Sequence, residues 1–276
     1  MVTTSSLPRP EMLHSFYRSS LRLTRKRGMR TLSRMNHWLF PRGQIAQLAT
    51  GCDFYLPPDP HFFGCLVGHE QHIADLIRET VEDGDTCIDV GANIGYFSLM
   101  MAARCGRRGR VYAYEPERAN FAMLEQNVAL AREQGLSVVA ARAAVSEAKG
   151  SVVLVPGAES TLHKVRHLDG PDADAAEVVP CVNLAEDLRE RGVEGPIKLI
   201  KIDVEGHEPE VLRGSIDFLM SGVAKFVVLE VFPGYAREIA DILRGHDVTV
   251  DCWLDGEWRA SPVEEITHLT DILIRF

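Results

Sequence analysis

Short apolar runs alternate with longer amphipathic stretches through most of the chain. A run of four to eight apolar residues between turn residues predicts a buried strand, whereas apolar positions three and four apart predict a helix. On this basis strands are expected over 87–90, 110–114, 137–145, 151–155, 178–182, 197–204, 223–232, 248–254 and 266–276. Helices are expected over 70–81, from the turn after Val90 through Cys105, and over 116–135, 183–191, 209–220 and 235–244. Pro116 should open its helix, and Asn183 should cap the next one.

Most of the predicted strands are separated by a helix. Strand–helix alternation requires a mainly parallel sheet with right-handed crossovers. The last two strands have no helix between them, and such a short connection requires antiparallel pairing. The expected fold class is therefore α/β, a mainly parallel doubly wound sheet with a reversed C-terminal strand. This is the Rossmann-like architecture of class I methyltransferases, and its ligands bind at the carboxyl ends of the strands.

The first 66 residues have a different pattern. Leu13 to Leu39 predicts one or two basic amphipathic helices, broken near Gly28 and ended by Pro41. Residues 50–66 contain three prolines and predict an irregular connector. We therefore expect a basic N-terminal extension and connector over 1–66, followed by one domain with this α/β architecture over 67–276.

Charge is distributed unevenly along the chain. Residues 1–50 carry a net charge of +8, because nine Arg and Lys oppose the single acid Glu11, and residues 51–276 carry −17. An acidic body disfavours binding to a phosphate backbone, so no nucleic-acid partner is expected. The basic residues between 9 and 42 are compatible with peripheral contact to an anionic membrane, and a targeting segment is an alternative.

The cysteines and histidines indicate neither a disulfide scaffold nor a metal site. The six cysteines are scattered without a C-x-x-C pair, and the chain has neither a long apolar signal region nor a membrane-length apolar run. This pattern favours free thiols and a cytoplasmic location. The run His69-Glu70-Gln71-His72 is one residue short of the H-E-x-x-H zinc motif, so no metal is expected.

The turn after the first strand of the main domain is the strongest functional signal. It reads Asp89-Val90-Gly91-Ala92-Asn93-Ile94-Gly95, and its glycines allow a tight turn and the close approach of a ligand. The following helix points its N-terminal N–H groups at the bound molecule. A dinucleotide motif would need glycine at Asn93 and Tyr96, so a pyrophosphate cradle is disfavoured. Glu115 ends the next strand, where a carboxylate can accept both ribose hydroxyls of an adenosine group.

A second polar cluster, Lys201-Ile202-Asp203-Val204-Glu205-Gly206-His207-Glu208, ends the apolar strand at 197–204. Methyl transfer from a sulfonium requires alignment of the nucleophile, and a hydroxyl nucleophile needs a base to remove its proton. His207 is the first candidate for this base, and Glu205 and Glu208 are its alternatives. These residues could instead cap the following helix, where acids favour the helix dipole.

Together these segments resemble the FkbM family of methyltransferases. The resemblance spans about residues 70–232 and rests on these segments: 88–98, Tyr114-Glu115-Pro116, Ala144-Val145-Ser146, 201–208, Leu212-Arg213-Gly214 and Leu229-Glu230-Val231. It implies S-adenosylmethionine as the methyl donor and O-methylation of sugars, polyketides or other natural products. It also implies a set of cofactor-binding positions: Asp89, Gly91, Ala92, Asn93, Gly95, Glu115, Ala144 beside the adenine, and Asp203 near the methionine end.

Other functions are weighed against this one. A short-chain dehydrogenase would need a Tyr-x-x-x-Lys pair, and none of the six tyrosines has Lys four positions later. Amino-group methyltransferases of nucleic acids carry an Asn/Asp-Pro-Pro-Tyr/Phe turn where this chain has residues 203–206. Cys181 precedes the strand at 197–204, so it is interpreted as a core residue rather than a nucleophile. A cofactor-binding protein without catalysis, and a methyltransferase acting on a nitrogen or a macromolecule, remain alternatives to a small-molecule or glycan acceptor.

Overall fold

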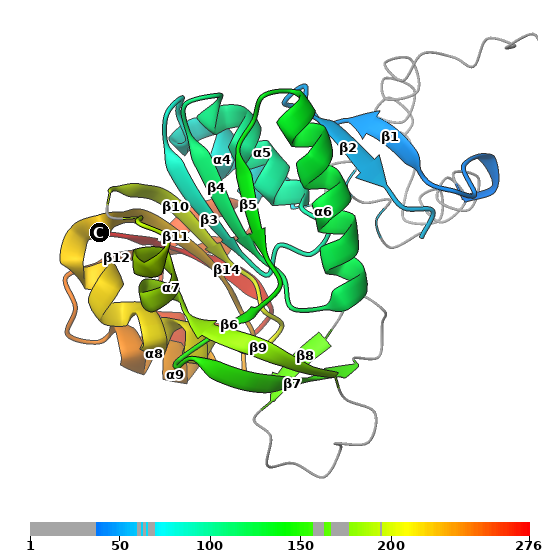
Figure 1. Ribbon diagram of the computed structural model, residues 1–276. Coiled ribbons are helices and arrows are strands. Elements are labelled where there is room, and N and C mark those ends of the chain that lie inside the picture. The colour runs from blue at the N-terminus through cyan, green and yellow to red at the C-terminus, as the bar shows by residue number, and fades with distance from the viewer. Residues whose placement is uncertain are drawn as a thin grey trace, which may run out of the picture.

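The computed structural model describes residues 37–59, 62, 65, 70–156, 163–166, 177–193 and 195–276. An eight-stranded sheet in the order β13-β12-β14-β11-β10-β3-β4-β5 forms its centre (Figure 1). Its strands are β3 (Thr86–Val90), β4 (Arg110–Tyr114), β5 (Val138–Ala141), β10 (Ile197–Ile202), β11 (Ala224–Val231), β12 (Thr249–Leu254), β13 (Glu257–Ala260) and β14 (Thr270–Arg275). The expected α/β class is confirmed.

The pairing of the strands fixes where a ligand can bind. β3 pairs in parallel with β4 on one side and with β10 on the other. The chain builds outward through β4 and β5, then returns to the other side of β3 with β10 and β11. This reversal makes the carboxyl ends of β3 and β10 the topological switch point, where doubly wound sheets bind ligands. β14 runs antiparallel to both β11 and β12, so the expected reversed strand is confirmed.

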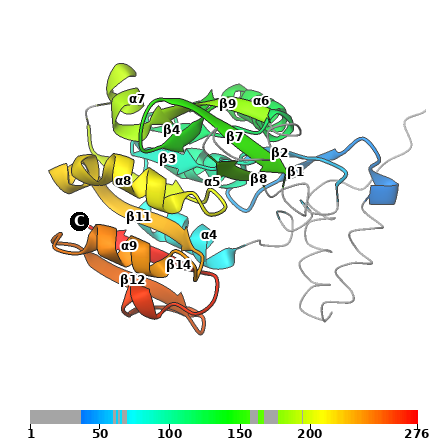
Figure 2. The same ribbon diagram turned by 90° about the horizontal axis from the view of Figure 1, so that it is seen from below.

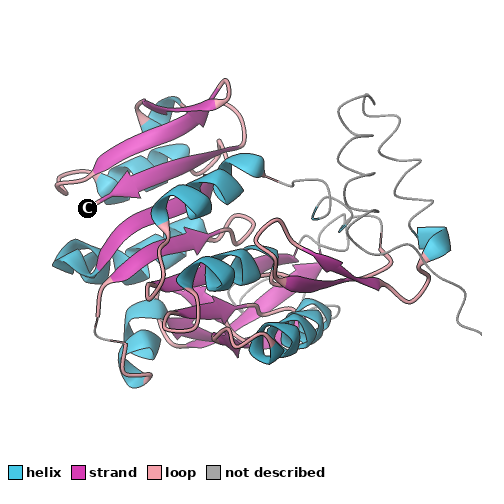
Figure 3. Ribbon diagram, turned by 90° about the horizontal axis from the view of Figure 1, so that it is seen from above, coloured by secondary structure: helices cyan, strands magenta, loops and turns pink. Residues whose placement is uncertain are grey.

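Helices cover both faces of the central sheet (Figure 3). α4 (Gln71–Thr80), α5 (Tyr96–Cys105) and α6 (Arg118–Glu133) share one hydrophobic core, and α7 (Leu184–Glu190), α8 (Glu208–Phe218) and α9 (Ala236–Leu243) share the other. Successive side chains of a strand point to opposite faces, so Cys87 lies in the first core and Ile88 in the second. A π-helical turn, Leu219–Val223, follows α8, and a 3₁₀ turn, Val263–Glu265, precedes β14. No helix in the described part of the chain is long and apolar enough to cross a membrane.

A second, four-stranded sheet follows β5 and has the order β6-β9-β7-β8. It consists of β6 (Ala144–Ser146), β7 (Gly150–Pro156), β8 (His163–Arg166) and β9 (Glu177–Asn183). The prediction of one strand over 137–145 was therefore wrong, because β5 and β6 belong to different sheets. A tight turn separates them, in which the Ala143 N–H donates to the Ala141 carbonyl at 3.1 Å. Cys181 is buried in the small core of this sheet, as interpreted from the sequence.

An N-terminal hairpin replaces part of the expected connector. β1 (Gln44–Gln47) pairs antiparallel with β2 (Asp53–Leu56), so the prediction of an irregular segment was wrong at β2. The three prolines, which suggested irregularity, all follow β2. Phe54 and Leu56 are fully buried in the core shared by α5 and α6. Figure 2 places this hairpin and β12 at opposite ends of the molecule. The helices predicted between residues 13 and 36 lie outside the described residues.

Two helix starts test the expected capping. The Asn183 side chain accepts a hydrogen bond from the Glu186 N–H at 3.1 Å and caps α7, as predicted. Pro116 does not open α6, which begins at Arg118. Glu117 is the cap instead, and its carboxylate accepts from the Asn120 N–H at 2.6 Å. This arrangement places Pro116 just before the cap, beside the strand-end residue Glu115.

Candidate active site at the carboxyl ends of β3, β4 and β10

The turn after β3 has a backbone that few residues other than glycine adopt. Gly91, Asn93 and Gly95 have φ angles of 82°, 51° and 90°. A Cβ at Gly91 would lie 1.7 Å from the Asp203 carbonyl oxygen, so only glycine fits where this turn crosses the end of β10. Gly95 caps α5 behind the turn, where a Cβ would meet Leu124 at 2.7 Å. The turn is therefore held in contact with the segment that carries Asp203.

Asp89 is buried beneath this turn, with 1% of its surface exposed. Its Oδ2 accepts a hydrogen bond from the Ser98 hydroxyl at 2.5 Å. Its Oδ1 is buried without a partner in the described part of the chain. Burial raises the pKa of Asp89, and the neighbouring Lys201 ammonium and the Ser98 hydroxyl oppose this shift. An unsatisfied buried carboxylate oxygen is costly, and a donor supplied by a ligand would satisfy it.

Glu115 lies directly after β4, and its carboxylate is held by two backbone groups. Oε2 accepts from the Asn93 N–H at 2.8 Å, and Oε1 accepts from the Glu117 N–H at 2.9 Å. A carboxylate offers about four acceptor positions, so these two bonds and the contact with Asn120 do not exhaust its capacity to accept from a ligand hydroxyl. Burial raises the pKa of Glu115 to about 7, and the backbone hydrogen bonds and the Asn120 side chain oppose the rise.

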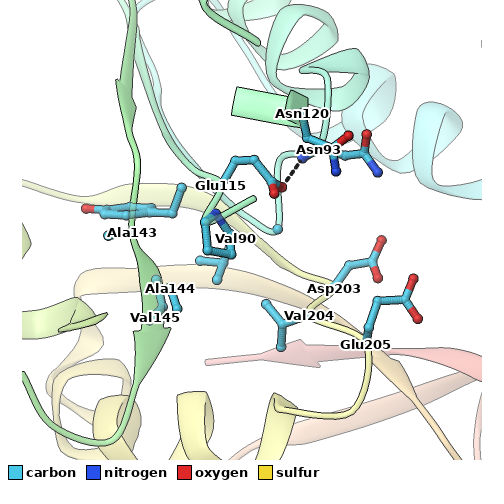
Figure 4. A pocket seen from close by; sticks show the side chains of 13 residues that line it. Val90, Asn93, Glu115, Asn120, Ala143, Ala144, Val145, Asp203, Val204 and Glu205 are labelled. Atoms are coloured by element: carbon cyan, nitrogen blue, oxygen red, sulfur yellow. Dashed lines mark hydrogen bonds between the residues drawn. The ribbon is translucent and has the colours of Figure 1, made fainter. Parts of the chain in front are cut away.

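Glu115 and Glu205 line the same hollow. Figure 4 shows Glu115 directed toward Asn93, with Asp203 and Glu205 beside one another across the hollow. Ala144, expected beside an adenine, lies on the wall with its neighbours Ala143 and Val145. The remaining lining residues are Val90, Gly91, Tyr114, Pro116, Asn120 and Val204.

A second hollow continues from the first, because Gly91, Asn93 and Asp203 line both. Asp89 and Ala92 line this second hollow. Its other lining residues are Cys65, Glu70, Ile94, Tyr96, Phe97 and Lys201. The two hollows together form one trough across the switch point, with Glu115 toward one end and Asp89 toward the other.

Lys201 is buried in the wall of the second hollow, where its ammonium pairs with acidic neighbours. Its ammonium donates to Asp203 Oδ2 at 2.8 Å and lies 5.2 Å from the centre of the Phe97 ring. Burial acts to lower the pKa of Lys201, but the carboxylates of Asp203 and Asp89 outweigh it and raise the pKa. Lys201 therefore stays protonated and holds Asp203 in position.

The three candidate bases lie in different environments. His207 is 4% exposed and occupies the N-cap position of α8, and it does not line either hollow. Its Nε2 lies 2.9 Å from the Ser146 hydroxyl, and its Nδ1 lies 3.5 Å from a carboxylate oxygen of Glu210. The ring is thus engaged by β6 and α8, and the geometry disfavours it as the base.

Glu208 and Glu205 also differ from one another. The buried Glu208 carboxylate accepts hydrogen bonds from the N–H groups of Val204 and Gly206, each at 3.0 Å, and so holds the loop. Glu205 lines the hollow, and its carboxylate has no hydrogen-bond or ion-pair partner among the described residues. Burial raises the pKa of Glu205 to about 7, with further increases from the charges of Asp203 and Glu208. Of the three candidates, Glu205 alone combines access to the hollow with an uncommitted carboxylate.

Two contributors to the site were not predicted. Asn120 is buried in the first turn of α6, lines the hollow and acts on the Glu115 carboxylate. Its position three residues after Glu117, in the first turn of the predicted helix, was the available signal. Lys201 is part of the motif at 201–208, but only the acids and the histidine of that motif were predicted to be site residues. A lysine on an apolar strand already indicates a buried ion pair.

A match to a known protein family identifies the family of this chain. The model of the methyltransferase FkbM domain matches residues 89–249. The chain belongs to the FkbM methyltransferase family. This match covers the glycine turn, Glu115 and the loop from Lys201 to Glu208, so the family expected from the sequence is confirmed.

Relatives in this family act on different molecules. The chain is 30% identical over 167 residues to the hexuronic acid methyltransferase AglP of Haloferax volcanii, covering 60% of this chain and 63% of that protein. It is 30% identical over 223 residues to the 31-O-demethyl-FK506 methyltransferase FkbM of Streptomyces tacrolimicus, covering 69% of this chain and 83% of that protein. A solved structure of methyltransferase FkbM from Methylobacillus flagellatus is 14% identical, with a TM-score of 0.46, covering 78% of this chain and 54% of that chain.

Membership of this family indicates S-adenosylmethionine as the cofactor, as the resemblance implied. The residues present fit this molecule. Glu115 retains acceptor positions for ribose hydroxyls, and the unpaired Asp89 Oδ1 is suited to an ammonium donor such as the methionine amino group. The carboxylates around Lys201 also suit a cationic sulfonium.

Proposed function

We propose that this protein transfers a methyl group from S-adenosylmethionine to a hydroxyl oxygen of a small-molecule or glycan acceptor. The observation that carries the proposal is the uncommitted Glu205 carboxylate, which lines the same hollow as Glu115. The names of two relatives, a hexuronic acid methyltransferase and a 31-O-demethyl-FK506 methyltransferase, support a sugar or polyketide hydroxyl as the acceptor.

The proposed roles follow from the positions of the side chains. Glu115 binds the ribose, Ala144 lies against the adenine, and Asp89 receives the methionine amino group. Asp203, held by Lys201, lies between the two hollows near the methionine end. Ala92 and Asn93 line the trough, and Gly91 and Gly95 shape the turn that forms its floor.

Glu205 is the proposed general base. S-adenosylmethionine supplies an electrophilic methyl group on a sulfonium, which needs no activation by a metal. The acceptor hydroxyl needs an acceptor for its proton as its oxygen forms the new bond, and the Glu205 carboxylate takes that proton. A pKa of about 7 leaves a useful fraction of Glu205 ionised at neutral pH and makes it more basic than an ordinary glutamate.

A labelled-methyl assay tests this function. The full chain is incubated with S-adenosylmethionine carrying a labelled methyl group and a panel of monosaccharides, nucleotide sugars and macrolides. We expect label in a product that is stable to base, as an ether is, together with S-adenosylhomocysteine. Cofactor binding by calorimetry without transfer to any acceptor would instead indicate a binding protein. Label on an amine or a macromolecule would overturn the hydroxyl assignment.

A further inference from the structure

The hairpin β1–β2 lies outside the residues matched by the family model and outside the central sheet. It nevertheless packs beside α6, as Figure 1 shows. Its inward side chains Phe54 and Leu56 are fully buried among residues of α5 and α6. The Phe54 ring meets the edge of the Tyr96 ring with their centres 6.1 Å apart, and Tyr96 lines the second hollow. The hairpin is thus adjacent to the proposed methionine end of the trough.

A single fully buried side chain on α6, Asn127, joins the hairpin to the helix. Its Oδ1 accepts from the Tyr55 N–H at 2.6 Å, and its Nδ2 donates to the Tyr55 carbonyl at 3.2 Å. The side-chain amide therefore pairs with both backbone groups of one residue, as the backbone of an adjacent strand would. Asn127 thus provides hydrogen-bond partners for the edge of β2 that faces α6. The other edge of β2 pairs with β1.

The same amide also reaches the cofactor turn. Asn127 Nδ2 donates a second hydrogen bond, to the Ile94 carbonyl at 2.7 Å. Ile94 belongs to the Gly91–Gly95 turn, in which Asn93 already adopts a left-handed backbone. Such a conformation persists only when its surroundings fix it. Asn127 is the residue of the described chain whose side chain bonds to both the hairpin and this turn.

We propose that Asn127 is a positioning residue through which the hairpin Gln44–Leu56 holds the Gly91–Gly95 turn in the shape that receives the methionine half of S-adenosylmethionine. This inference rests on the proposed function for its ligand and on the hydrogen bonds above for its mechanism. It assigns a role in cofactor binding to a segment that lies before the family match. Asn127 itself lines neither hollow, so it acts through the backbone of Ile94.

A matched pair of variants in the full chain tests this role. Gln134, the residue directly after α6, accepts a hydrogen bond from the Asp53 N–H at 3.0 Å. It therefore binds the hairpin but not the turn. Asn127→Ala should weaken S-adenosylmethionine binding by about tenfold or more in calorimetry, because three backbone groups, among them the buried Ile94 carbonyl, lose this partner. Gln134→Ala should change the affinity by less than about threefold. Each is measured well below the unfolding temperature of that variant.

Hydrogen exchange of the amides at 91–95, measured without cofactor, gives a second readout. Exchange should be about tenfold faster in Asn127→Ala and unchanged in Gln134→Ala. If Asn127→Ala does not fold, Asn127→Asp replaces it, since Asp keeps the volume and the acceptor for the Tyr55 N–H but has no N–H for the carbonyls of Tyr55 and Ile94.

The results separate this inference from the proposed function. Variants that unfold at lower temperature but retain wild-type exchange at 91–95 and wild-type cofactor affinity would overturn the positioning role. A wild-type protein that binds no S-adenosylmethionine would refute the proposed function instead. The exchange comparison, which needs no cofactor, would still decide whether Asn127 fixes the turn.

Discussion

Glu205 occupies a backbone conformation that is unusual for its residue type. Its φ angle is 57°, and Gly206 follows with a φ angle of 98°. The left-handed region costs a residue with a Cβ about 1–2 kcal/mol, so the loop must be held there by other contacts. The Glu208 carboxylate provides them by accepting from the N–H groups of Val204 and Gly206. Glu205 and Glu208 were equivalent candidates in the sequence, but their positions differ. Glu208 holds the loop, and the loop directs Glu205 into the hollow.

Replacement of Glu205 by Gln should abolish proton removal while keeping the side-chain volume. We expect Glu205→Gln to lower kcat by about 10²–10⁴ and to leave cofactor affinity nearly unchanged. In the wild type, kcat should fall as the pH drops through about 7, because the protonated carboxyl cannot accept a proton. His207→Gln is the control and should keep this pH profile. A His207→Gln enzyme that loses as much turnover as Glu205→Gln would restore His207 as the base.

Glu115 is predicted to dominate the recognition of the ribose. Glu115→Ala should weaken S-adenosylmethionine binding by about 1.5–3 kcal/mol, because charge-assisted hydrogen bonds are lost. Glu186→Ala, at an exposed position of α7, controls for a general effect of removing a glutamate. Wild-type affinity should also rise between pH 6 and pH 8, as a group with a pKa of about 7 becomes charged. Calorimetry that finds equal affinity for wild type and Glu115→Ala would refute the assignment.

At the scale of elements, the crossing of the glycine turn over the end of β10 fixes the floor of the trough. Gly91 and Gly84 both have strongly positive φ angles, but only Gly91 is crowded. Gly84→Ala should cost about 1–2 kcal/mol of stability from backbone strain alone. Gly91→Ala adds a clash with the Asp203 carbonyl, so it should cost several kcal/mol more or prevent folding. Chemical denaturation of the two variants measures the difference, and equal losses would mean that the turn moves freely away from β10.

The elements that the sequence predicted correctly are those with a strong local signal. The β3 turn, the helix capped by Asn183 and the apolar strand β10 each carry their own pattern of apolar and turn residues. The strand β13 was not predicted, although the Asp255-Gly256 pair that joins β12 to β13 is an equally strong hairpin signal, with both residues at positive φ.

Other features depend on long-range packing and have no local signature. The corner between β5 and β6 interrupts a continuous apolar run, so periodicity cannot reveal it. The hairpin β1–β2 is short and is hydrogen-bonded through Tyr55 to Asn127 of α6, 72 residues later in the chain. Residue type and spacing in the sequence were enough to locate the loop at 203–208 that carries the three candidate bases. They could not show that His207 turns to Ser146, because β6 lies in a different sheet. The division of the chain at residue 66 stays a prediction.

At the scale of the whole molecule, several buried glutamates have a raised pKa. Burial raises the pKa of Glu115 and Glu208 to about 7 and that of Glu230 to about 9. A folded-state pKa above the unfolded value means that the native protein binds more protons, so stability is lost as the pH rises through the folded pKa. We therefore expect the cofactor-free protein to have a lower Tm at pH 9 than at pH 6. Calorimetric scans that show a higher Tm at pH 9 would mean that these groups are ionised at little cost.

The opposite charges of residues 1–50 and of the remaining chain lead to a second whole-molecule prediction. The basic segment should bind vesicles with anionic headgroups, since each basic residue near such a surface contributes about 1 kcal/mol. The full chain should cosediment with phosphatidylserine-containing vesicles at low salt and be released by added salt. A chain lacking residues 1–36 should stay in solution yet bind S-adenosylmethionine normally, because the hairpin is retained. Equal sedimentation of both chains would exclude the segment as the membrane contact.

The order of strands in the central sheet also determines how the protein is made. β3 lies between β4 and β10, yet it leaves the ribosome more than a hundred residues before β10. During that interval the β3-β4-β5 half of the sheet has an unpaired apolar edge at β3, which is the type of surface that captures other nascent chains. Until β10 is synthesised, this edge is protected only if a chaperone covers it or if translation reaches β10 quickly. We therefore expect the yield of soluble protein to depend strongly on the conditions of synthesis, even if the folded protein is stable.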